Sequence, residues 1–283
     1  MKLRWLVVTV AVLGVVAAWA CRSVDAGSGG AITVKGSDTM VNLCTAWAEA
    51  FMKKNAGMQV AVTGGGSGTG IAAMLNKTTD ICSASRKVRE AEITQGKAKG
   101  VDFKEFVVAR DGISIVVNKE NPIQAITLDQ LRKIFNGTYK NWSEVGLPDG
   151  KIEVLSRETS SGTYVYFQEE VLQKDNYSQE ARLMTSNAAI AQAVSQDKNA
   201  IGYIGVAYAK KADVKIVGVK KVEMSQPVMP TDETIKDDTY PVSRPLHLYT
   251  NGEPAGNIKA FIDFAFSEDG QKIVEDIGFV RVK

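Results

Sequence analysis

The segment Arg157-Glu158-Thr159-Ser160-Ser161-Gly162-Thr163 joins a strand-like run at residues 152–155 to an amphipathic, helix-like run at residues 164–172. It places an arginine at the end of a strand and hydroxyl groups at the start of a helix. The first turn of a helix presents about four unpaired backbone N–H groups and roughly half a positive charge. A guanidinium adds a rigid fork of donors. The segment therefore predicts an α/β unit that binds a tetrahedral oxyanion.

Two earlier segments have the same placement between a strand-like and a helix-like run. They are Gly36-Ser37-Asp38-Thr39 and Gly64-Gly65-Gly66-Ser67-Gly68-Thr69-Gly70. Arg86 follows another predicted strand and can add a second permanent charge. The glycine segment matches neither a phosphate-binding P-loop nor a nucleophile elbow. A turn that needs several positive φ angles explains its glycines without any ligand, so this alternative stays open.

Strand-like and helix-like runs alternate along most of the chain from residue 31 onward, which is typical of parallel α/β sheets. The clearest predicted strands are residues 31–35, 59–63, 80–84, 103–108, 112–117, 152–155, 201–204, 214–217 and 246–249. We predict an α/β fold of two lobes, comprising residues 31–111 with 245–283 and residues 112–244. The second lobe includes a proline-containing connector at 219–242. Two chain crossings, near residues 111–118 and 240–250, are expected to form a hinge.

The N-terminus predicts export. Residues 1–20 read as a signal peptide, because Lys2 and Arg4 precede an apolar run that is too short to span a membrane. Cys21 follows a sequence that is similar to a bacterial lipobox, so we predict lipidation at Cys21 and a flexible tether at residues 21–30. Cleavage at an Ala-x-Ala site, which would give a free secreted protein, remains the alternative.

Composition excludes several classes of function. The formal net charge of +2 falls to zero when Lys2 and Arg4 are removed, and the chain has no basic stripe, so nucleic acid is not an expected partner. His247 is the single histidine and lies in an alternating strand, which argues against a histidine metal site or a catalytic triad. No metal or other cofactor is expected. Cys44 and Cys82 fit either a disulfide or two buried free thiols.

Taken together, the three segments resemble the ligand loops of the substrate-binding proteins of bacterial phosphate ABC transporters. The third carries the pattern Arg-x-x-x-Ser-Gly-Thr, the first is followed at the right distance by Trp47, and the likeness covers the chain from residue 31 onward. The resemblance implies a type II-like, two-lobe periplasmic-binding-protein fold that closes over the anion. It implies phosphate contacts at Ser37, Asp38, Thr39, Ser67, Arg157, Ser161, Gly162 and Thr163.

One position departs from the family pattern. In the best-known members an aspartate follows the Ala-Ser pair that is Ala84-Ser85 here, and it accepts a proton from phosphate, whereas this chain has Arg86. We predict that Asp38 has taken over this role and that Arg86, opposite it, is also part of the phosphate-binding site. An ionised aspartate accepts the P–OH of phosphate, whereas sulfate has no proton to donate. Alternatively, Asp38 is an ordinary helix cap with Arg86 as its surface partner.

The favoured function is capture of inorganic phosphate outside the cytoplasmic membrane and delivery to the permease subunits of an ABC transporter. No enzyme activity is expected, because the sequence shows neither a metal cluster nor an activated nucleophile. A monomer is expected as well. The nearest alternative is a receptor for another tetrahedral oxyanion, such as molybdate, tungstate or sulfate. A secreted phosphatase and a phosphate sensor are the remaining alternatives.

Overall fold

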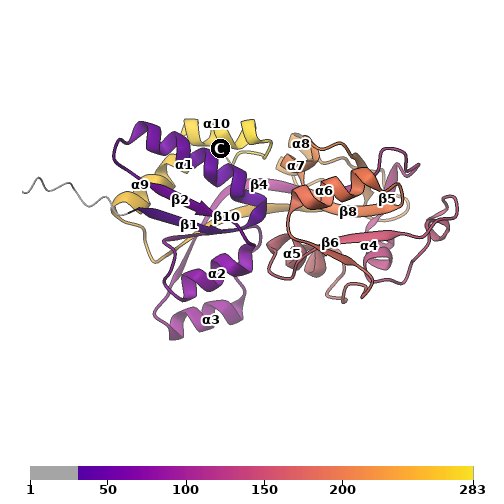
Figure 1. Cartoon of the computed structure of the whole chain (residues 1–283), viewed down its shortest axis with the longest axis horizontal. Helices are drawn as coiled ribbons and strands as arrows, with labels where there is room; N and C mark the ends of the chain where they lie inside the picture. The colour runs from indigo at the N-terminus through magenta and orange to yellow at the C-terminus, as the bar shows by residue number, and fades with distance from the viewer. Residues whose placement is uncertain (1–30, 283) are drawn as a thin grey trace, which may run out of the picture.

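The structure is a computed structural model that describes residues 31–282. The expected signal peptide at residues 1–20, the lipidation site Cys21 and the tether at residues 21–30 lie outside the described residues. Figure 1 shows two α/β lobes placed end to end. The predicted α/β fold is therefore confirmed.

Lobe 1 is built on the parallel strands β1 (Ile32–Gly36), β2 (Val60–Thr63) and β3 (Ile81–Ala84). Its helices are η1 (Asp38–Met40), α1 (Val41–Lys54), α2 (Ser67–Leu75), α3 (Glu90–Ala98), α9 (Gly256–Phe266) and α10 (Glu268–Ile277). Figure 1 shows α1, α9 and α10 on one face of the sheet and α2 and α3 on the other. Leu43, Trp47 and Phe51 recur at helical spacing on α1 and are buried, so this apolar stripe faces the core.

Lobe 2 contains the parallel strands β6 (Glu153–Arg157), β7 (Arg182–Met184) and β8 (Ala200–Gly205), and the parallel pair β5 (Ala125–Thr127) and β9 (Lys215–Lys220). Its helices are α4 (Leu128–Phe135), η2 (Trp142–Val145), α5 (Gly162–Glu170), α6 (Asn187–Gln196), α7 (Val206–Ala209) and α8 (Asp232–Lys236). The core packs Phe167 against Tyr203, with stacked rings 4.1 Å apart. This packing anchors α5 on the sheet and so fixes the position of its first turn.

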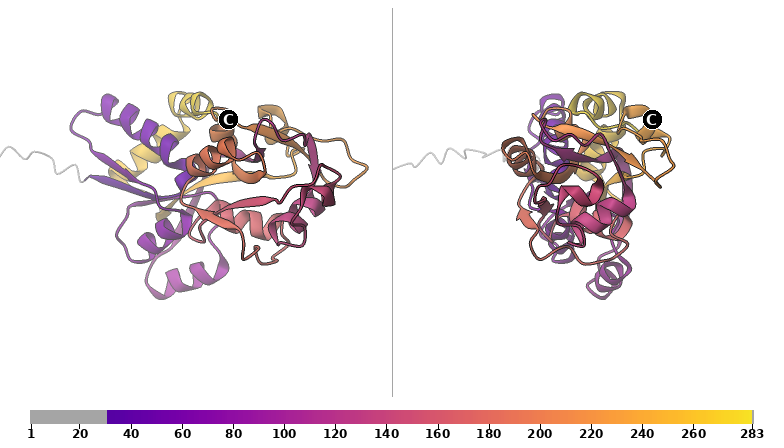
Figure 2. Two further views of the ribbon diagram at one scale, coloured as in Figure 1. Left: turned by 45° about the vertical axis from the view of Figure 1, so that its right-hand side comes forward. Right: turned by 90° about the vertical axis from the view of Figure 1, so that its right-hand side faces the viewer.

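Two strands pass between the lobes, β4 (Phe103–Val117) and β10 (Ser243–Asn251). β4 pairs with β10 as far as Gly112 and with β8 and β9 beyond it. One sheet therefore runs through both lobes in the order β2-β1-β3-β10-β4-β8-β6-β7. The predicted lobe boundaries, after Asp111 and before Pro245, fall inside these strands. In Figures 1 and 2 the C-terminal helices (yellow) lie against lobe 1, although they follow lobe 2 in the sequence.

The structure differs from the sequence prediction in several elements. The two strands predicted at residues 103–108 and 112–117 are one continuous strand, β4, because the polar pair Arg110-Asp111 between them does not interrupt backbone pairing with β10. The short elements β5, β7, α7 and α8 were not predicted, since three to five residues give too little periodicity. α8 lies within the predicted connector, which is therefore not wholly irregular.

The two cysteines near the core of lobe 1 are free thiols. Cys44 on α1 and Cys82 on β3 are both buried. Burial raises the pKa of Cys44 to about 12, so its thiol is protonated at neutral pH. The structure thus has the free-thiol alternative rather than the disulfide.

Candidate functional site

The three Ser/Gly segments meet where the lobes face each other. Within lobe 1, the Gly66 N–H donates to the Gly36 carbonyl at 2.9 Å and holds the first two segments together. Two hydrogen bonds then connect lobe 1 with the third segment. The Gly68 N–H donates to the Ser160 carbonyl at 2.9 Å, and the Ser160 hydroxyl donates to the Gly65 carbonyl at 3.2 Å. Segments that are far apart in the sequence therefore form one site between the lobes.

Hydroxyl groups from both lobes line this site. Thr39 Oγ1 of lobe 1 and Thr163 Oγ1 of lobe 2 are 2.9 Å apart. Ser67 Oγ accepts the Ser85 N–H at 3.0 Å. Ser37 Oγ is buried and has no hydrogen-bond partner within residues 31–282. The site thus holds several short side chains that can donate to an anion.

The start of α5 brings backbone N–H groups to the same place. Ser161 is the N-cap, and its Oγ accepts the Thr163 N–H at 3.1 Å. Gly162 follows, and a Cβ built on it would lie 2.3 Å from Ser67 Oγ and 2.7 Å from Ser85 Oγ. A residue with a side chain does not fit here, so glycine permits the close approach of the lobes. The helix N-terminus faces the hydroxyl groups of lobe 1 and favours a negative charge there.

Arg157, at the end of β6, supplies the buried positive charge of the site and is 2% exposed. Its Nη2 donates to the Thr185 carbonyl at 2.9 Å and its Nε to the Met184 carbonyl at 3.3 Å. Nη1 lies 3.1 Å from Asp38 Oδ2, but the angle is not that of a hydrogen bond, so Nη1 has no hydrogen-bond partner among the described residues. Burial lowers the pKa of Arg157, and the carboxylate of Asp38 opposes this shift.

Asp38, in η1, is the carboxylate of the site. Its Oδ2 accepts the backbone N–H of Asn187 at 3.1 Å and the Asn187 side-chain amide at 2.7 Å. Both of these hydrogen bonds and the contact with Arg157 involve Oδ2, which leaves Oδ1 as the carboxylate oxygen that can accept from a ligand. Because Asn187 belongs to lobe 2, the orientation of Asp38 depends on contact between the lobes.

The predicted pairing of Asp38 with Arg86 is wrong. Nη1 and Nη2 of Arg86 each donate to a carboxylate oxygen of Glu92 at 2.8 Å, and Nη1 also donates to the Lys87 carbonyl. Glu92 lies in the first turn of α3, the helix that follows Arg86, so a nearby partner holds the guanidinium. Arg157 faces Asp38 instead. We therefore leave Arg86 out of the ligand set proposed below.

A buried ion pair that was not predicted from the sequence lies beside the site. Nε and Nη2 of Arg244, on β10, donate to Asp111 Oδ2, on β4, at 3.1 and 2.7 Å. Both side chains are 0% exposed. Nη2 of Arg244 also lies 3.1 Å from Thr163 Oγ1. Asp111 directly precedes the apolar run at residues 112–117, and Arg244 directly precedes Pro245 and Leu246, so both were candidates for burial. Charged residues are almost never buried without a partner, which was a usable signal for an ion pair. Asn187 carried no comparable signal.

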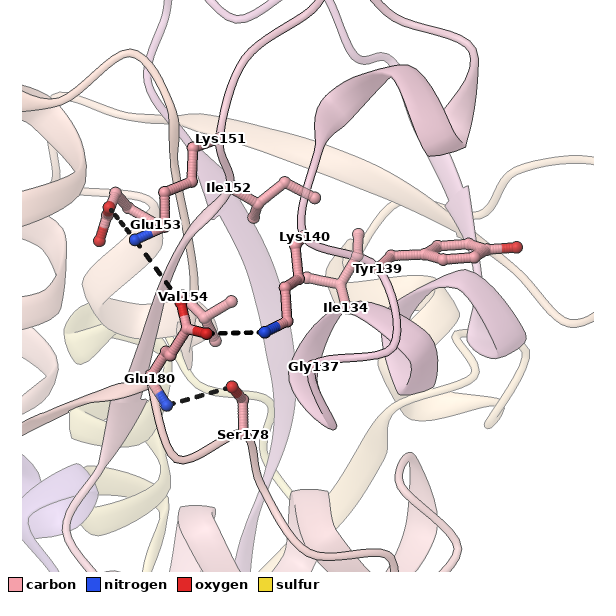
Figure 3. Close-up of a pocket in the computed structure, with 10 residues that line it drawn as sticks. All are labelled: Ile134, Gly137, Tyr139, Lys140, Lys151, Ile152, Glu153, Val154, Ser178 and Glu180. Atoms are coloured by element: carbon pink, nitrogen blue, oxygen red, sulfur yellow. Dashed lines mark hydrogen bonds and ion pairs between the residues drawn. The ribbon is translucent and has the colours of Figure 1, made fainter.

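Charged side chains also gather around a hollow in lobe 2, away from the three segments. Figure 3 shows Lys140, Lys151, Glu153 and Glu180 there, connected by ion pairs. The hollow measures about 20 Å³, room for little more than a water molecule. Its charges neutralise one another, so it does not compete with the site between the lobes.

The described part of the chain was searched for metal sites and for membrane-spanning helices. Within residues 31–282, no group of three or more His, Cys, Asp or Glu side chains is arranged to hold a metal ion. None of the helices that the structure describes is long and apolar enough to cross a membrane.

Comparison with known proteins now identifies the family. The family model for the PBP superfamily domain matches residues 23–269. The phosphate-binding protein PstS of Staphylococcus saprophyticus is 34% identical over 265 residues, which cover 91% of this chain and 82% of that protein. The chain belongs to the PBP superfamily and to its phosphate-binding proteins. PstS of Pseudomonas aeruginosa is 32% identical over 308 residues, with 99% of this chain and 95% of that protein covered.

Solved structures agree with this membership. A putative phosphate ABC transporter substrate-binding protein with bound phosphate, from Clostridium perfringens, superposes with a TM-score of 0.81 at 32% identity and covers 89% of this chain and 100% of its own. An ABC-type phosphate transport receptor from Vibrio cholerae has a TM-score of 0.73 at 30% identity, covering 88% of this chain and 99% of its own. The predicted family resemblance and the periplasmic-binding-protein fold are therefore both confirmed.

Proposed function

We propose that this protein captures inorganic phosphate between its lobes and delivers it to the permease subunits of an ABC transporter. The observation that carries the proposal is that two buried donors of the segments, Ser37 Oγ in lobe 1 and Arg157 Nη1 in lobe 2, make no hydrogen bond within residues 31–282. Buried polar groups are almost always hydrogen-bonded, so donors without a hydrogen bond on both sides of one site call for a ligand that accepts from each lobe. Phosphate does so with several oxygens, and phosphate binding is what the names of the relatives describe.

The proposed ligands are those residues of the three segments that can reach a shared anion. They are Ser37, Asp38, Thr39, Ser67, Arg157, Ser161, Gly162 and Thr163. Most of these residues would donate hydrogen bonds to the anion, whereas Oδ1 of Asp38 would accept one from it. Phosphate near neutral pH carries a P–OH group that can donate to Oδ1, whereas sulfate brings an unprotonated oxygen against the carboxylate. We therefore infer selection of phosphate over sulfate, which by this kind of mismatch reaches about 10⁴-fold.

Calorimetric titration of the exported protein with phosphate, sulfate and molybdate tests the proposal. The wild-type protein is expected to bind phosphate far more tightly than sulfate. Asp38→Asn is expected to narrow the ratio of the two dissociation constants by about 10²-fold, because phosphate loses a charge-assisted hydrogen bond and sulfate loses a repulsion. Asp102→Asn is the matched control, since Asp102 is exposed and lies outside the site. Failure to bind any of these anions overturns the function, and an unchanged ratio in Asp38→Asn overturns the role of that residue.

The cellular setting is part of the proposal. The N-terminal sequence supports export, followed by lipid anchoring at Cys21, and the relatives' names support partnership with ABC transporter permeases. We further propose that the protein has no enzyme activity, since its relatives are named as binding proteins, and that it acts as a monomer. Mass spectrometry of the mature N-terminus tests the anchor, because an unmodified Cys21 contradicts it.

A further inference from the structure

Arg244 touches both lobes and both of the strands that connect them. It lies on β10, and its ion-pair partner Asp111 lies on β4. Its Nη1 donates to the Ser85 carbonyl of lobe 1 at 2.9 Å, while Nη2 reaches Thr163 Oγ1 of lobe 2 at 3.1 Å. Asp111 in turn accepts the Val206 N–H of lobe 2 at 3.1 Å. The ion pair therefore holds groups from both sides of the site in one hydrogen-bonded network.

The chemistry of Arg244 sets the direction of the hydrogen bond to Thr163. A guanidinium has donors and no acceptor, so Thr163 Oγ1 must be the acceptor in this contact. A hydroxyl has one proton, and the Thr163 proton is therefore left to point away from Arg244. Thr39 Oγ1, 2.9 Å away, is the partner it faces in the described structure. An anion that enters between the two threonines meets an oriented O–H donor.

The geometry points to Arg244 as a positioning residue that acts through Thr163, fixing its hydroxyl as a donor toward the bound anion. The inference rests on the proposed function, since it assigns a new residue to the same site. The same orientation of the Thr163 hydroxyl contributes to selection of phosphate over sulfate. If Thr163 were free to rotate, its lone pairs could accept the phosphate proton, and Asp38 would no longer be the acceptor on which selection depends.

A double-mutant cycle tests whether Arg244 acts through the Thr163 hydroxyl. Arg244→Lys keeps the charge but removes the fork that reaches Asp111 and Thr163 together. It is expected to raise the phosphate dissociation constant about tenfold in the wild-type background. In a Thr163→Val background, which has no hydroxyl to orient, Arg244→Lys is expected to cause less than about a twofold change. In a Thr163→Ser background the loss of about tenfold is expected to return, because serine keeps the hydroxyl.

The control is Arg110→Lys. Arg110 lies on β4 and, like Arg244, pairs with a carboxylate, but its side-chain partners, Asp238 and the Ile235 carbonyl, lie outside the three segments. Its replacement is expected to leave phosphate affinity unchanged. Thermal unfolding of each variant confirms that it is folded. If Arg244→Lys does not fold, the double variant Arg244→Met with Asp111→Leu replaces the whole ion pair by apolar groups and takes its place in the cycle.

The outcomes separate the two proposals. Equal losses in all three Thr163 backgrounds mean that Arg244 acts by its charge or by general stabilisation, and they overturn the positioning role. No loss in any background overturns it as well. Neither result contradicts the proposal of phosphate capture, because the titration of the wild-type protein in the same series tests phosphate binding directly. A wild-type protein that binds no phosphate overturns both.

Discussion

Substitution of Gly162 by alanine is expected to weaken closure of the lobes over phosphate without lowering the stability of the ligand-free protein. Gly162 is the first residue of α5 in lobe 2 and faces Ser67 and Ser85 in lobe 1. The added Cβ would lie 2.3 Å from Ser67 Oγ and 2.7 Å from Ser85 Oγ, whereas ordinary van der Waals contact begins at 3.4 Å. In the closed arrangement the new Cβ therefore either displaces these two hydroxyl groups or moves the lobes apart, in each case by about 1 Å, and both changes disturb the binding groups.

The cost of this substitution falls on the closed, ligand-bound protein. In a helix, alanine is favoured over glycine by about 0.5–1 kcal/mol, so the free energy of unfolding of an open, ligand-free protein does not fall. A misplacement of about 1 Å in a set of binding groups costs about 10²-fold. We therefore expect the phosphate dissociation constant of Gly162→Ala to rise about 100-fold, equivalent to about 2.7 kcal/mol. The melting temperature without ligand is expected to stay unchanged or rise.

Isothermal titration calorimetry with phosphate measures the affinity, and scanning calorimetry measures the ligand-free melting temperature. Gly64→Ala is the matched control, because a Cβ on Gly64 would meet no atom nearer than 3.7 Å. It is expected to bind phosphate as the wild type does. Small-angle scattering is expected to show a decrease in radius of gyration with phosphate for the wild type and Gly64→Ala. Wild-type affinity in a folded Gly162→Ala protein refutes the argument that the lobes meet at these atoms around the ligand.

Two further predictions concern groups outside the anion site. Arg89→Ala removes an exposed ion pair between the lobes, in which Arg89 Nη2 lies 2.7 Å from Glu169 Oε1. Exposed ion pairs contribute about 0.2–1 kcal/mol, so titration is expected to show at most about a fivefold loss of phosphate affinity. A larger loss contradicts the expectation that this exposed ion pair contributes little to phosphate binding. Burial lowers the pKa of His247 from 6.5 to about 4, although the neighbouring Glu105 carboxylate acts to raise it. As the pH falls from 6.5 toward 4, the histidine is therefore protonated in the unfolded chain before it is protonated in the folded protein. The free energy of unfolding decreases over this range. Urea unfolding across this range is expected to show a shallower pH dependence for His247→Gln, and parallel curves contradict the assignment.

Local patterns in the sequence were enough to predict a candidate oxyanion site. A strand, a short Ser/Gly segment and a helix follow one another in the chain, so the donors at Ser161, Gly162 and Thr163 could be recognised without tertiary structure. The same holds for Arg157, which lies four residues before Ser161. Each of these features depends on neighbours in sequence, and helix capping and strand ends are local events.

The partners of the charged groups could not be predicted in this way. Arg157 ends β6 and Arg86 lies two residues after the end of β3, yet Glu92 holds Arg86 and Asp38 faces Arg157. Which arginine reaches which carboxylate depends on distances between elements far apart in the chain. The ion pair of Arg244 with a residue on β4 is likewise the result of antiparallel pairing between strands that lie at opposite ends of the second lobe in sequence.

The sequence by itself determined that the chain is an α/β protein with Ser/Gly segments suited to a tetrahedral oxyanion. Hydrophobic periodicity and helix N-termini depend on consecutive residues, so both can be recognised from the sequence. Only the tertiary structure decided how these segments meet. It brought Thr39 Oγ1 and Thr163 Oγ1 to 2.9 Å, placed Asp38 against Arg157, and left two buried donors, Ser37 Oγ and Arg157 Nη1, without a hydrogen bond among the described residues. The physical reason is that burial and pairing of charges depend on packing between the lobes, which no local pattern records.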